Sequence, residues 1–258
     1  MNNIIIFILI LIIFSIFYFL NQNLKYKIVT YENFQNNNIP KIIIQTWKTK
    51  NIPEKYKEDY NSIRKYNPDF QFLFFSDNDI IYFLENNYPK YYKSYKKLPL
   101  KIQKIDYFKY IAIYHYGGFY FDLDMVGLYP LNELLDYDSV FPVEQNIRKR
   151  NCNVNRFKKY CKIGLNFMLG QYAFGAKPQN DFIKLLIDTI HENIDLYIQN
   201  YKKDGKTSQY VCSTTGSDFI TSMYIDYNKK DDIHILEFDH SQYFGKYAKH
   251  KHYGVWKK

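Results

Sequence analysis

A glycine pair that leads through aromatic residues into two aspartates limits the fold of this 258-residue chain more than any other feature. The segment reads YGGFYFDLD over residues 116–124. Its aromatic run predicts a short strand, and the alternation of side chains along a strand puts Asp122 and Asp124 on one face, about 6.6 Å apart. Two carboxylates at a strand end suit a divalent cation whose shell is completed by substrate phosphates. A solvated loop that carries both aspartates by chance is the alternative.

Residues 98–116, LPLKIQKIDYFKYIAIYHY, precede the glycine pair and predict an amphipathic helix. Their apolar residues recur at intervals of three and four, which is the periodicity of one helix face. Gly117 suits the end of this helix, because glycine adopts a left-handed backbone conformation without a steric penalty. Helix, glycine pair, strand and paired aspartates are therefore predicted to form one structural unit.

The rest of the chain alternates between predicted strands and helices, which indicates an α/β sheet with helices on its faces. Strands are predicted at residues 41–47, 71–75, 173–176 and 233–238. Helices are predicted at residues 53–66, from a capping segment at 76–79 to Tyr88, and at 181–200. Residues 148–162 are basic and irregular, and they predict a loop over the site.

These segments, in this order, resemble glycosyltransferase family 32. That family's helix carries Ala-Asp-x-x-Arg-Tyr and is followed by Gly-Gly-x-Tyr-x-Asp-x-Asp. The matching residues of this chain are Asp106, Lys109, Tyr110, Gly117, Gly118, Tyr120, Asp122 and Asp124. Further matches are the opening strand IPKIIIQTWK at residues 39–48, the Thr215-Gly216-Ser217 turn, and Ala248-Lys249-His250 with Trp256 beyond it. The chain departs from the family's histidine, arginine and proline at Ile44, Lys109 and Ser217.

The resemblance implies a GT-A-type nucleotide-sugar-binding domain, which is an α/β fold with a Rossmann-like mixed sheet flanked by helices. It implies a metal-dependent glycosyltransferase of the DXD type that moves a hexose from a UDP- or GDP-sugar to a glycan, lipid or protein hydroxyl. Members of the family retain the anomeric configuration. Because no carboxylate in the sequence stands out as a nucleophile, retention here predicts a same-face attack in which the leaving phosphate takes the acceptor's proton.

The resemblance implies that Asp124 and Asp122 bind Mn²⁺ or Mg²⁺, with Asp122 also contacting donor hydroxyls. His250 would complete the metal shell through an imidazole nitrogen, and His252 is close enough in sequence to be its substitute. An exposed histidine in a basic tail is the competing interpretation of His250.

The resemblance also implies donor-binding roles for five other residues. Asp106 and Lys109 would contact the donor sugar, or would simply pair with each other on a helix surface at a spacing of three residues. Lysine also lacks the bidentate fork of the family's arginine, which bears on sugar specificity. Trp47 would stack on the nucleobase or pack in the core, and Trp256 would donate to a phosphate oxygen or pack the C-terminus. Gln171 would face the sugar.

Composition limits the partners and the redox chemistry of the chain. A formal net charge of +9 favours anionic partners such as nucleotide diphosphates or membrane phosphates, or reflects lysines on a solvated surface. No zinc finger, RNA-recognition signature or helix-turn-helix pattern points to nucleic acid. Cys152, Cys161 and Cys212 fit neither a disulfide scaffold nor a zinc site, so free buried thiols are expected. A Cys152–Cys161 pair is the alternative in an oxidising lumen.

A nearly continuous apolar run over residues 4–20 is at the lower limit of the about 17–25 residues that span a bilayer. No small-residue cleavage site follows it, which favours an uncleaved signal anchor. The predicted parts are a membrane anchor at residues 1–24, a polar tether at 25–38 and a transferase domain at 39–258. The resemblance places the domain of this single-pass protein on the Golgi or ER lumenal side, whereas Lys25 and Lys27 favour the cytoplasmic side.

Other classes of function fit some of the same residues. Lys109 and Ile44 suit a catalytically inactive, membrane-anchored protein that binds nucleotide sugars or carbohydrate, which predicts metal-dependent donor binding without turnover. A structural membrane protein whose aspartates cap a strand predicts no effect of divalent metal on nucleotide binding. A nuclease is disfavoured, because no third acidic ligand or lysine motif accompanies the two aspartates.

Overall fold

The computed structural model describes residues 11–16, 38–204, 208–238 and 243–254. Contacts divide the chain into two units, Met1–Asn37 and Asn38–Lys258. In the first unit the described residues are helical. The second unit carries the sheet and the candidate site.

The single-pass membrane localisation expected from the N-terminal run is contradicted. Across the described residues, no helix has the length and apolar character that a membrane crossing requires. Within the run, residues 11–16 are described, and they are helical. The rest of the predicted anchor, and the predicted tether before Asn38, lie outside the described residues.

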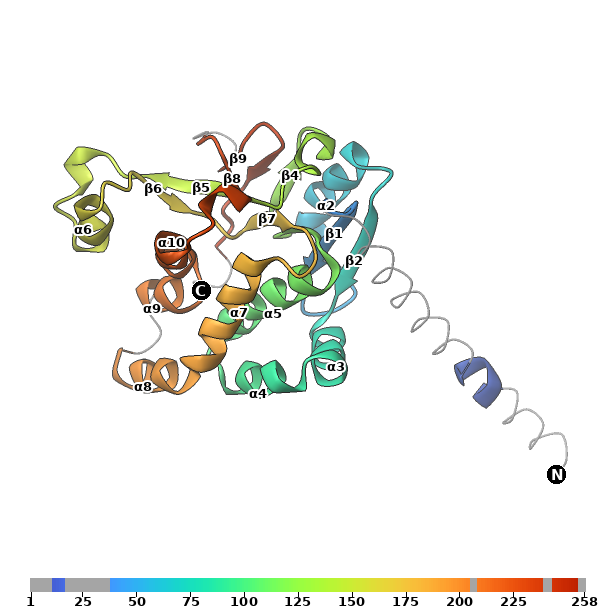
Figure 1. Cartoon of the computed structure of the whole chain (residues 1–258). Coiled ribbons are helices and arrows are strands. Elements are labelled where there is room, and N and C mark those ends of the chain that lie inside the picture. The colour runs from blue at the N-terminus through green and yellow to red at the C-terminus, as the bar shows by residue number, and fades with distance from the viewer. Residues whose placement is uncertain (1–10, 17–37, 205–207, 239–242, 255–258) are drawn as a thin grey trace, which may run out of the picture. The chain divides into compact units, whose positions relative to one another are not determined.

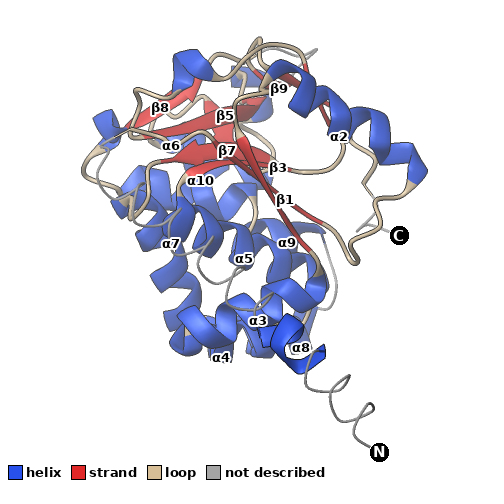
Figure 2. Cartoon of the chain, turned by 90° about the vertical axis from the view of Figure 1, so that its right-hand side faces the viewer, coloured by secondary structure: helices blue, strands red, loops and turns tan. Residues whose placement is uncertain are grey.

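A mixed seven-stranded sheet forms the centre of the second unit (Figures 1 and 2). Its strands are β1 Ile42–Thr46, β2 Gln71–Phe75, β3 Gly118–Phe121, β5 Ser139–Asn146, β6 Phe167–Leu169, β7 Ala173–Ala176 and β8 Ile233–Leu236. The order is β2-β1-β3-β7-β5-β6, with β8 beside β5. β1, β2 and β3 are parallel, and β5 runs in the same direction because β7 is antiparallel to both β3 and β5. The carboxyl ends of β1, β3 and β5 therefore meet at one edge, where open α/β sheets bind ligands.

Helices cover both faces of this sheet. They are α2 Glu54–Tyr66, α3 Asp77–Asn87, α4 Pro89–Lys97, α5 Lys101–Tyr116, α6 Asn155–Lys162, α7 Asp181–Glu192, α8 Ile194–Asp204, α9 Ser208–Thr214 and α10 Ser217–Asp226. Figure 2 shows α5 and α7 below the sheet and α2 on the opposite side. α2 packs on a second, small sheet of order β4-β10-β9, formed by β4 Met125–Gly127, β10 Ala248–His250 and β9 Tyr243–Phe244.

Most of the locally encoded elements are where the sequence predicts them. The predicted strands at 41–47, 71–75 and 173–176 correspond to β1, β2 and β7, and the helix before the glycine pair is α5. However, α5 is buried on most of its surface, because it lies between the sheet and the helices α4, α7 and α9. The helix predicted over 181–200 is instead two helices, α7 and α8, which are separated at Asn193.

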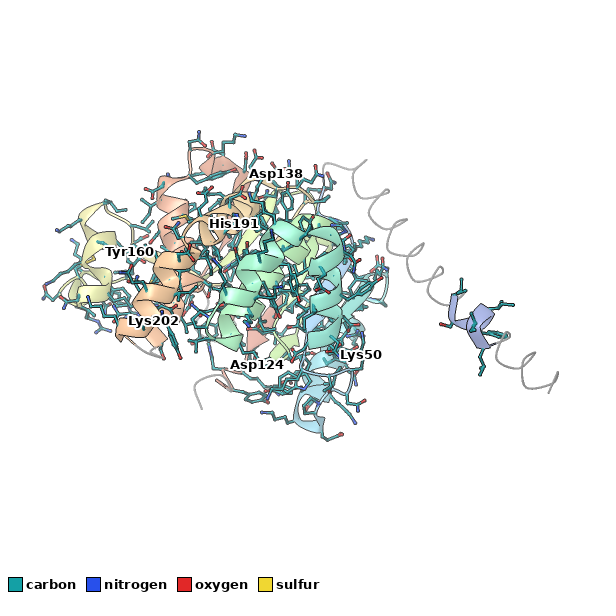
Figure 3. All side chains as sticks on the ribbon, turned by 90° about the horizontal axis from the view of Figure 1, so that it is seen from below. Lys50, Asp124, Asp138, Tyr160, His191 and Lys202 are labelled. Carbon is teal, nitrogen blue, oxygen red and sulfur yellow. A yellow bond between two sulfur atoms is a disulfide. The ribbon has the colours of Figure 1, made fainter. Side chains whose placement is uncertain are left out.

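The predicted basic loop is partly helical. β5 and β6 extend beyond the other strands of the sheet, and the segment between them contains α6 (Figure 1). Tyr160 of α6 is labelled in Figure 3. Tyr160 is fully buried there in a small apolar cluster with Phe157 and Met168. Cys152 and Cys161 form a disulfide across this segment, so the expectation of free thiols is wrong for these two. Cys212 is free, as expected.

Gly118 begins β3 with a positive φ of 91° and lies against β1, where an added Cβ would be 2.4 Å from the Ile42 carbonyl oxygen. Gly118→Ala is therefore expected to lower the free energy of unfolding by at least about 2 kcal/mol, through backbone strain and displacement of β1. Urea denaturation measures the change. Gly164→Ala is the matched control, since Gly164 also has a positive φ, of 76°, but no described heavy atom lies within 4 Å of its added Cβ. An equal loss in both variants would rule out the contact with β1 as the cause.

Candidate active site

A cavity of about 470 Å³ opens at the edge of the sheet where β1, β3 and β5 end. Trp47, which follows β1, lines one part of it, and the two aspartates that follow β3 line the centre. β5 contributes Glu144, α5 contributes Asp106 and Lys109, and β10 contributes His250. Segments that are far apart in the sequence therefore converge on one concave surface, as is usual for small-molecule sites.

Asp122 and Asp124 lie on a turn and not on an extended strand, which corrects the expected geometry. β3 ends at Phe121 and β4 begins at Met125. The Met125 amide donates to the Asp122 carbonyl oxygen at 3.2 Å, which closes a turn around Leu123. The turn nevertheless brings both carboxylates to the same side, so the inference of a paired site does not depend on strand alternation.

His250 is brought to this turn by strand pairing. β10 pairs antiparallel with β4, and His250 lies opposite Met125, the residue after the turn. The His250 Nε2 atom is 3.3 Å from Asp124 Oδ1. One ligand atom from each of Asp122, Asp124 and His250 lies within 4.8 Å of the others, which is the spacing of a metal-ligand set.

The surroundings shift the pKa values of the two carboxyl groups in opposite directions. Burial raises the pKa of Asp122 to about 6, against the opposing effect of the Lys109 charge. Its Oδ1 accepts a hydrogen bond of 2.9 Å from the Tyr120 hydroxyl. Burial acts on Asp124 too, but hydrogen bonds from His250 and from the Tyr253 amide hold its pKa below the ordinary value. Asp124 is therefore the more firmly ionised member of the pair at neutral pH.

Asp106 and Lys109 form an ion pair, but it is not on a helix surface. Lys109 Nζ lies 2.9 Å from Asp106 Oδ1, with relative side-chain exposures of 2% and 0%. The Thr215 hydroxyl donates to the other carboxylate oxygen at 2.8 Å. Lys109 Nζ also lies 5.1 Å from the centre of the Tyr120 ring, which is a cation–π distance. The pair links α5 to the α9–α10 connection, and both of its residues line the cavity.

Trp47 follows β1, which β3 and β7 separate from β5 in the sheet. Its ring is half-buried and contacts the Tyr56 ring, with 5.0 Å between the centroids. Lys48 Nζ lies 5.8 Å from the centre of the same indole ring. The exposed part of the indole therefore offers a flat face beside a cation, and its stacking on a nucleobase stays a prediction.

The remaining predicted residues differ in how well they are placed. Gln171 lines the cavity, and its Oε1 atom is buried and accepts no hydrogen bond from any described residue. Trp256 lies outside the described residues. His252 lies beside His250, with 4.0 Å between ring centroids, but only His250 belongs to the described metal-ligand set.

Several residues of the cavity wall were not singled out by sequence reasoning. They include Glu144 and Tyr172. Glu144 had one recognisable signal, since it is an acidic residue at the end of the apolar run SVFPV. That run was not assigned to a strand, so the signal was missed. Tyr172 lies directly before β7, and no local pattern in the sequence marks it as a cavity residue.

Residues 53–141 match the family described as "Glycosyltransferase sugar-binding region containing DXD motif". The matched segment includes α5, the glycine pair and both aspartates. The resemblance to glycosyltransferase family 32 is confirmed. The chain resembles inositol phosphoceramide mannosyltransferase 1 of Schizosaccharomyces pombe, with 40% identity over 100 residues that are 38% of this chain and 31% of that protein.

Inositol phosphoceramide mannosyltransferase 2 of the same yeast is 38% identical over 159 residues, which cover 62% of this chain and 40% of that protein. The chain thus spans less than half the length of these two family 32 relatives. An uncharacterized glycosyltransferase of Acanthamoeba polyphaga mimivirus is 24% identical over 208 residues, which cover 80% of this chain and 72% of that protein.

Solved structures show the same fold. The ligand-free glycosyltransferase domain from the YGT toxin superposes with a TM-score of 0.52 and 9% identity, covering 79% of this chain and 81% of that domain. Its UDP-bound form gives a TM-score of 0.50 and 9% identity, covering 78% and 80%. The mixed α/β architecture is therefore similar to that of GT-A glycosyltransferase domains, as expected for a relative of family 32.

Proposed function

We propose that this chain is a metal-dependent glycosyltransferase that transfers a sugar from a nucleotide diphosphate sugar to a hydroxyl of a glycan, lipid or protein. The observation that carries the proposal is the cluster of Asp122, Asp124 and His250 in the cavity. Both aspartates belong to the segment that matches a DXD sugar-binding region. Cluster, cavity and matched segment thus coincide.

The donor atoms fit a divalent cation. Two carboxylates and one imidazole suit Mn²⁺, and Mg²⁺ accepts the carboxylates together with substrate phosphates. His250 Nδ1 is buried and has no hydrogen-bond partner among the described residues, so the His250 ring is not committed to another interaction on that side. When bound, the cation would supply Lewis-acid stabilisation of the negative charge that develops on the leaving diphosphate.

In this proposal each part of a nucleotide sugar has residues that would bind it. The nucleobase would stack on Trp47, and Trp256 would donate to a phosphate oxygen. The donor sugar would lie near Asp106, Lys109 and the amide nitrogen of Gln171, whose polar atoms suit its hydroxyls, while Gln171 Oε1 would remain for a second ligand. The UDP-bound structural neighbour supports UDP as the nucleotide of the donor. The mannosyltransferase relatives support mannose as the sugar, so GDP-mannose is also a candidate donor.

We further propose that the reaction retains the anomeric configuration by a same-face attack. The acceptor oxygen forms the new bond to the anomeric carbon as the bond from that carbon to the diphosphate oxygen breaks. The acceptor's proton passes to the departing diphosphate oxygen, so no protein group has to take it. In this scheme Asp106 and Lys109 orient the sugar, and the buried site excludes water that would compete with the acceptor.

The proposal is tested with the full-length chain and a panel of UDP- and GDP-sugars, with a mixture of glycan and glycolipid acceptors. Release of nucleoside diphosphate is expected from at least one donor in the presence of Mn²⁺, and it should fall to background in excess chelator. A folded protein that binds nucleotide with Mn²⁺ but turns over no donor would instead be the inactive binding protein. Product anomers identified by NMR test retention separately.

A further inference from the structure

Glu144 occupies a β-bulge at the cavity end of β5. Val143 faces Leu169 on β6 and Gln145 faces Met168, so Glu144 is the extra residue of β5 in this ladder. A bulge interrupts the alternation of a strand and re-aims the side chain next to it. The Glu144 side chain accordingly lines the cavity.

The surroundings of Glu144 hold a carboxylate in place. Ser217 and the charge of Arg156 both favour its ionised form. Arg156 is itself fixed by Asp218, with 2.9 Å from Nε to Oδ2. Burial raises the pKa of Glu144, while Ser217 of α10 and Arg156 of α6 lower it. These two residues therefore partly offset the effect of burial on the carboxylate.

The position of Glu144 relative to the donor follows from the order of the strands. Trp47 follows β1, the metal-ligand set follows β3, and Glu144 lies in β5, with β7 between β3 and β5. Adjacent strands are about 4.8 Å apart, so β5 lies about 10 Å beyond β3 and away from β1. A donor whose base is at Trp47 and whose diphosphate is at the metal would therefore have its sugar between Asp122 and Glu144.

Gln171 supplies a second, independent sign of a ligand on this side. The amide of the preceding residue, Gly170, donates to the carbonyl oxygen of Pro142 in β5 at 2.8 Å, which puts Gln171 beside β5, near Glu144. The buried Gln171 Oε1 has no donor among the described side chains and backbone amides. A buried acceptor without a partner lowers the stability of the protein, and a ligand hydroxyl would remove that cost.

We propose that Glu144 binds the acceptor and that this acceptor presents a ring with several hydroxyl groups. The Glu144 carboxylate accepts hydrogen bonds from ring hydroxyls, Gln171 Oε1 accepts another, and the attacking hydroxyl is thereby held beyond the donor sugar. No covalent bond to Glu144 forms, and the proton still passes to the departing diphosphate oxygen. The inference rests on the proposed function in calling this ligand the acceptor, but the binding of a polyhydroxyl ring is testable without turnover.

The test uses the full chain with Mn²⁺ and saturating UDP or GDP, titrated with methyl α-mannopyranoside and followed by NMR. Glu144→Gln is expected to weaken binding of this probe about ten- to hundredfold, because a hydrogen bond to a charged group is lost. Its nucleotide affinity should stay within about twofold of wild type. Glu144→Asp should restore part of the probe affinity, and Glu58→Gln, an exposed carboxylate on α2, should leave it unchanged.

Each outcome bears on the proposal. Wild-type probe affinity in Glu144→Gln, an equal loss of nucleotide binding, or no probe binding by the wild type would overturn it. In an active enzyme, the variant should lose transfer to the acceptor while keeping hydrolysis of the donor. Equal loss of both reactions would make Glu144 a donor-side group or a nucleophile. If the wild type binds the probe through Glu144 but turns over no donor, the proposed function fails and the binding inference stands.

Discussion

Asp124→Asn is expected to lower metal-dependent release of nucleoside diphosphate by at least about a thousandfold. The substitution preserves the size of the side chain and an oxygen that can accept the 3.0 Å hydrogen bond from the Tyr253 amide. It removes a negative charge from the set formed with Asp122 and His250. Metal ions provide several kcal/mol of transition-state stabilisation, and each 1.36 kcal/mol corresponds to about tenfold in rate. A coupled assay at saturating Mn²⁺ measures the rate, and calorimetry measures Mn²⁺ affinity.

The matched control is Asp231→Asn, which removes one charge from an exposed carboxylate outside the cavity. It should retain the wild-type rate. Excess chelator should lower the wild type to the level of Asp124→Asn and have no further effect on that variant. Unchanged Mn²⁺ affinity together with an unchanged rate in Asp124→Asn would place the cation outside this turn and remove the basis of the proposed function.

The sequence predicts the centre of the site because the signals there are local. The periodicity of residues 98–116 ends at Gly117, and the next residues return to β1 through Gly118, whose missing side chain permits the close approach. These features need no distant partner, so the helix, the strand and the position of the aspartates follow from about thirty consecutive residues. The strand alternation assumed for Asp122 and Asp124 was wrong, because the Met125 amide donates to the Asp122 carbonyl oxygen and closes a turn. That turn depends on where β4 begins, which the local sequence does not specify.

The rest of the site depends on contacts between residues far apart in the chain. His250 reaches the turn only through the pairing of β10 with β4, and no pattern in the C-terminal tail specifies that register. Glu144 lines the cavity because it lies in a β-bulge, and that bulge results from the register shift in the pairing of β5 with β6. The spacing of Asp106 and Lys109 predicts a pair, but the burial of that pair requires the α9–α10 connection and its Thr215.

Lys109→Met is expected to lower the free energy of unfolding by about 3–5 kcal/mol, because it leaves the Asp106 carboxylate buried without its cation. The two side chains are 2% and 0% exposed, so water cannot replace the lost partner. The hydroxyl of Thr215 still donates to Asp106, but one neutral donor does not balance a buried charge. Urea denaturation of the wild type and of the variant at neutral pH measures the loss.

Two comparisons separate the buried charge from a general effect of losing a lysine. Lys184→Met breaks a largely exposed pair with Asp188 and should cost less than about 1 kcal/mol. Adding Asp106→Asn to Lys109→Met should recover much of the loss, since Asp106 then no longer carries a buried charge without its cation. If Lys109→Met costs no more than Lys184→Met, the ion pair contributes nothing measurable to stability. If the double variant remains as unstable as the single one, lost packing of the lysine stem is the cause instead.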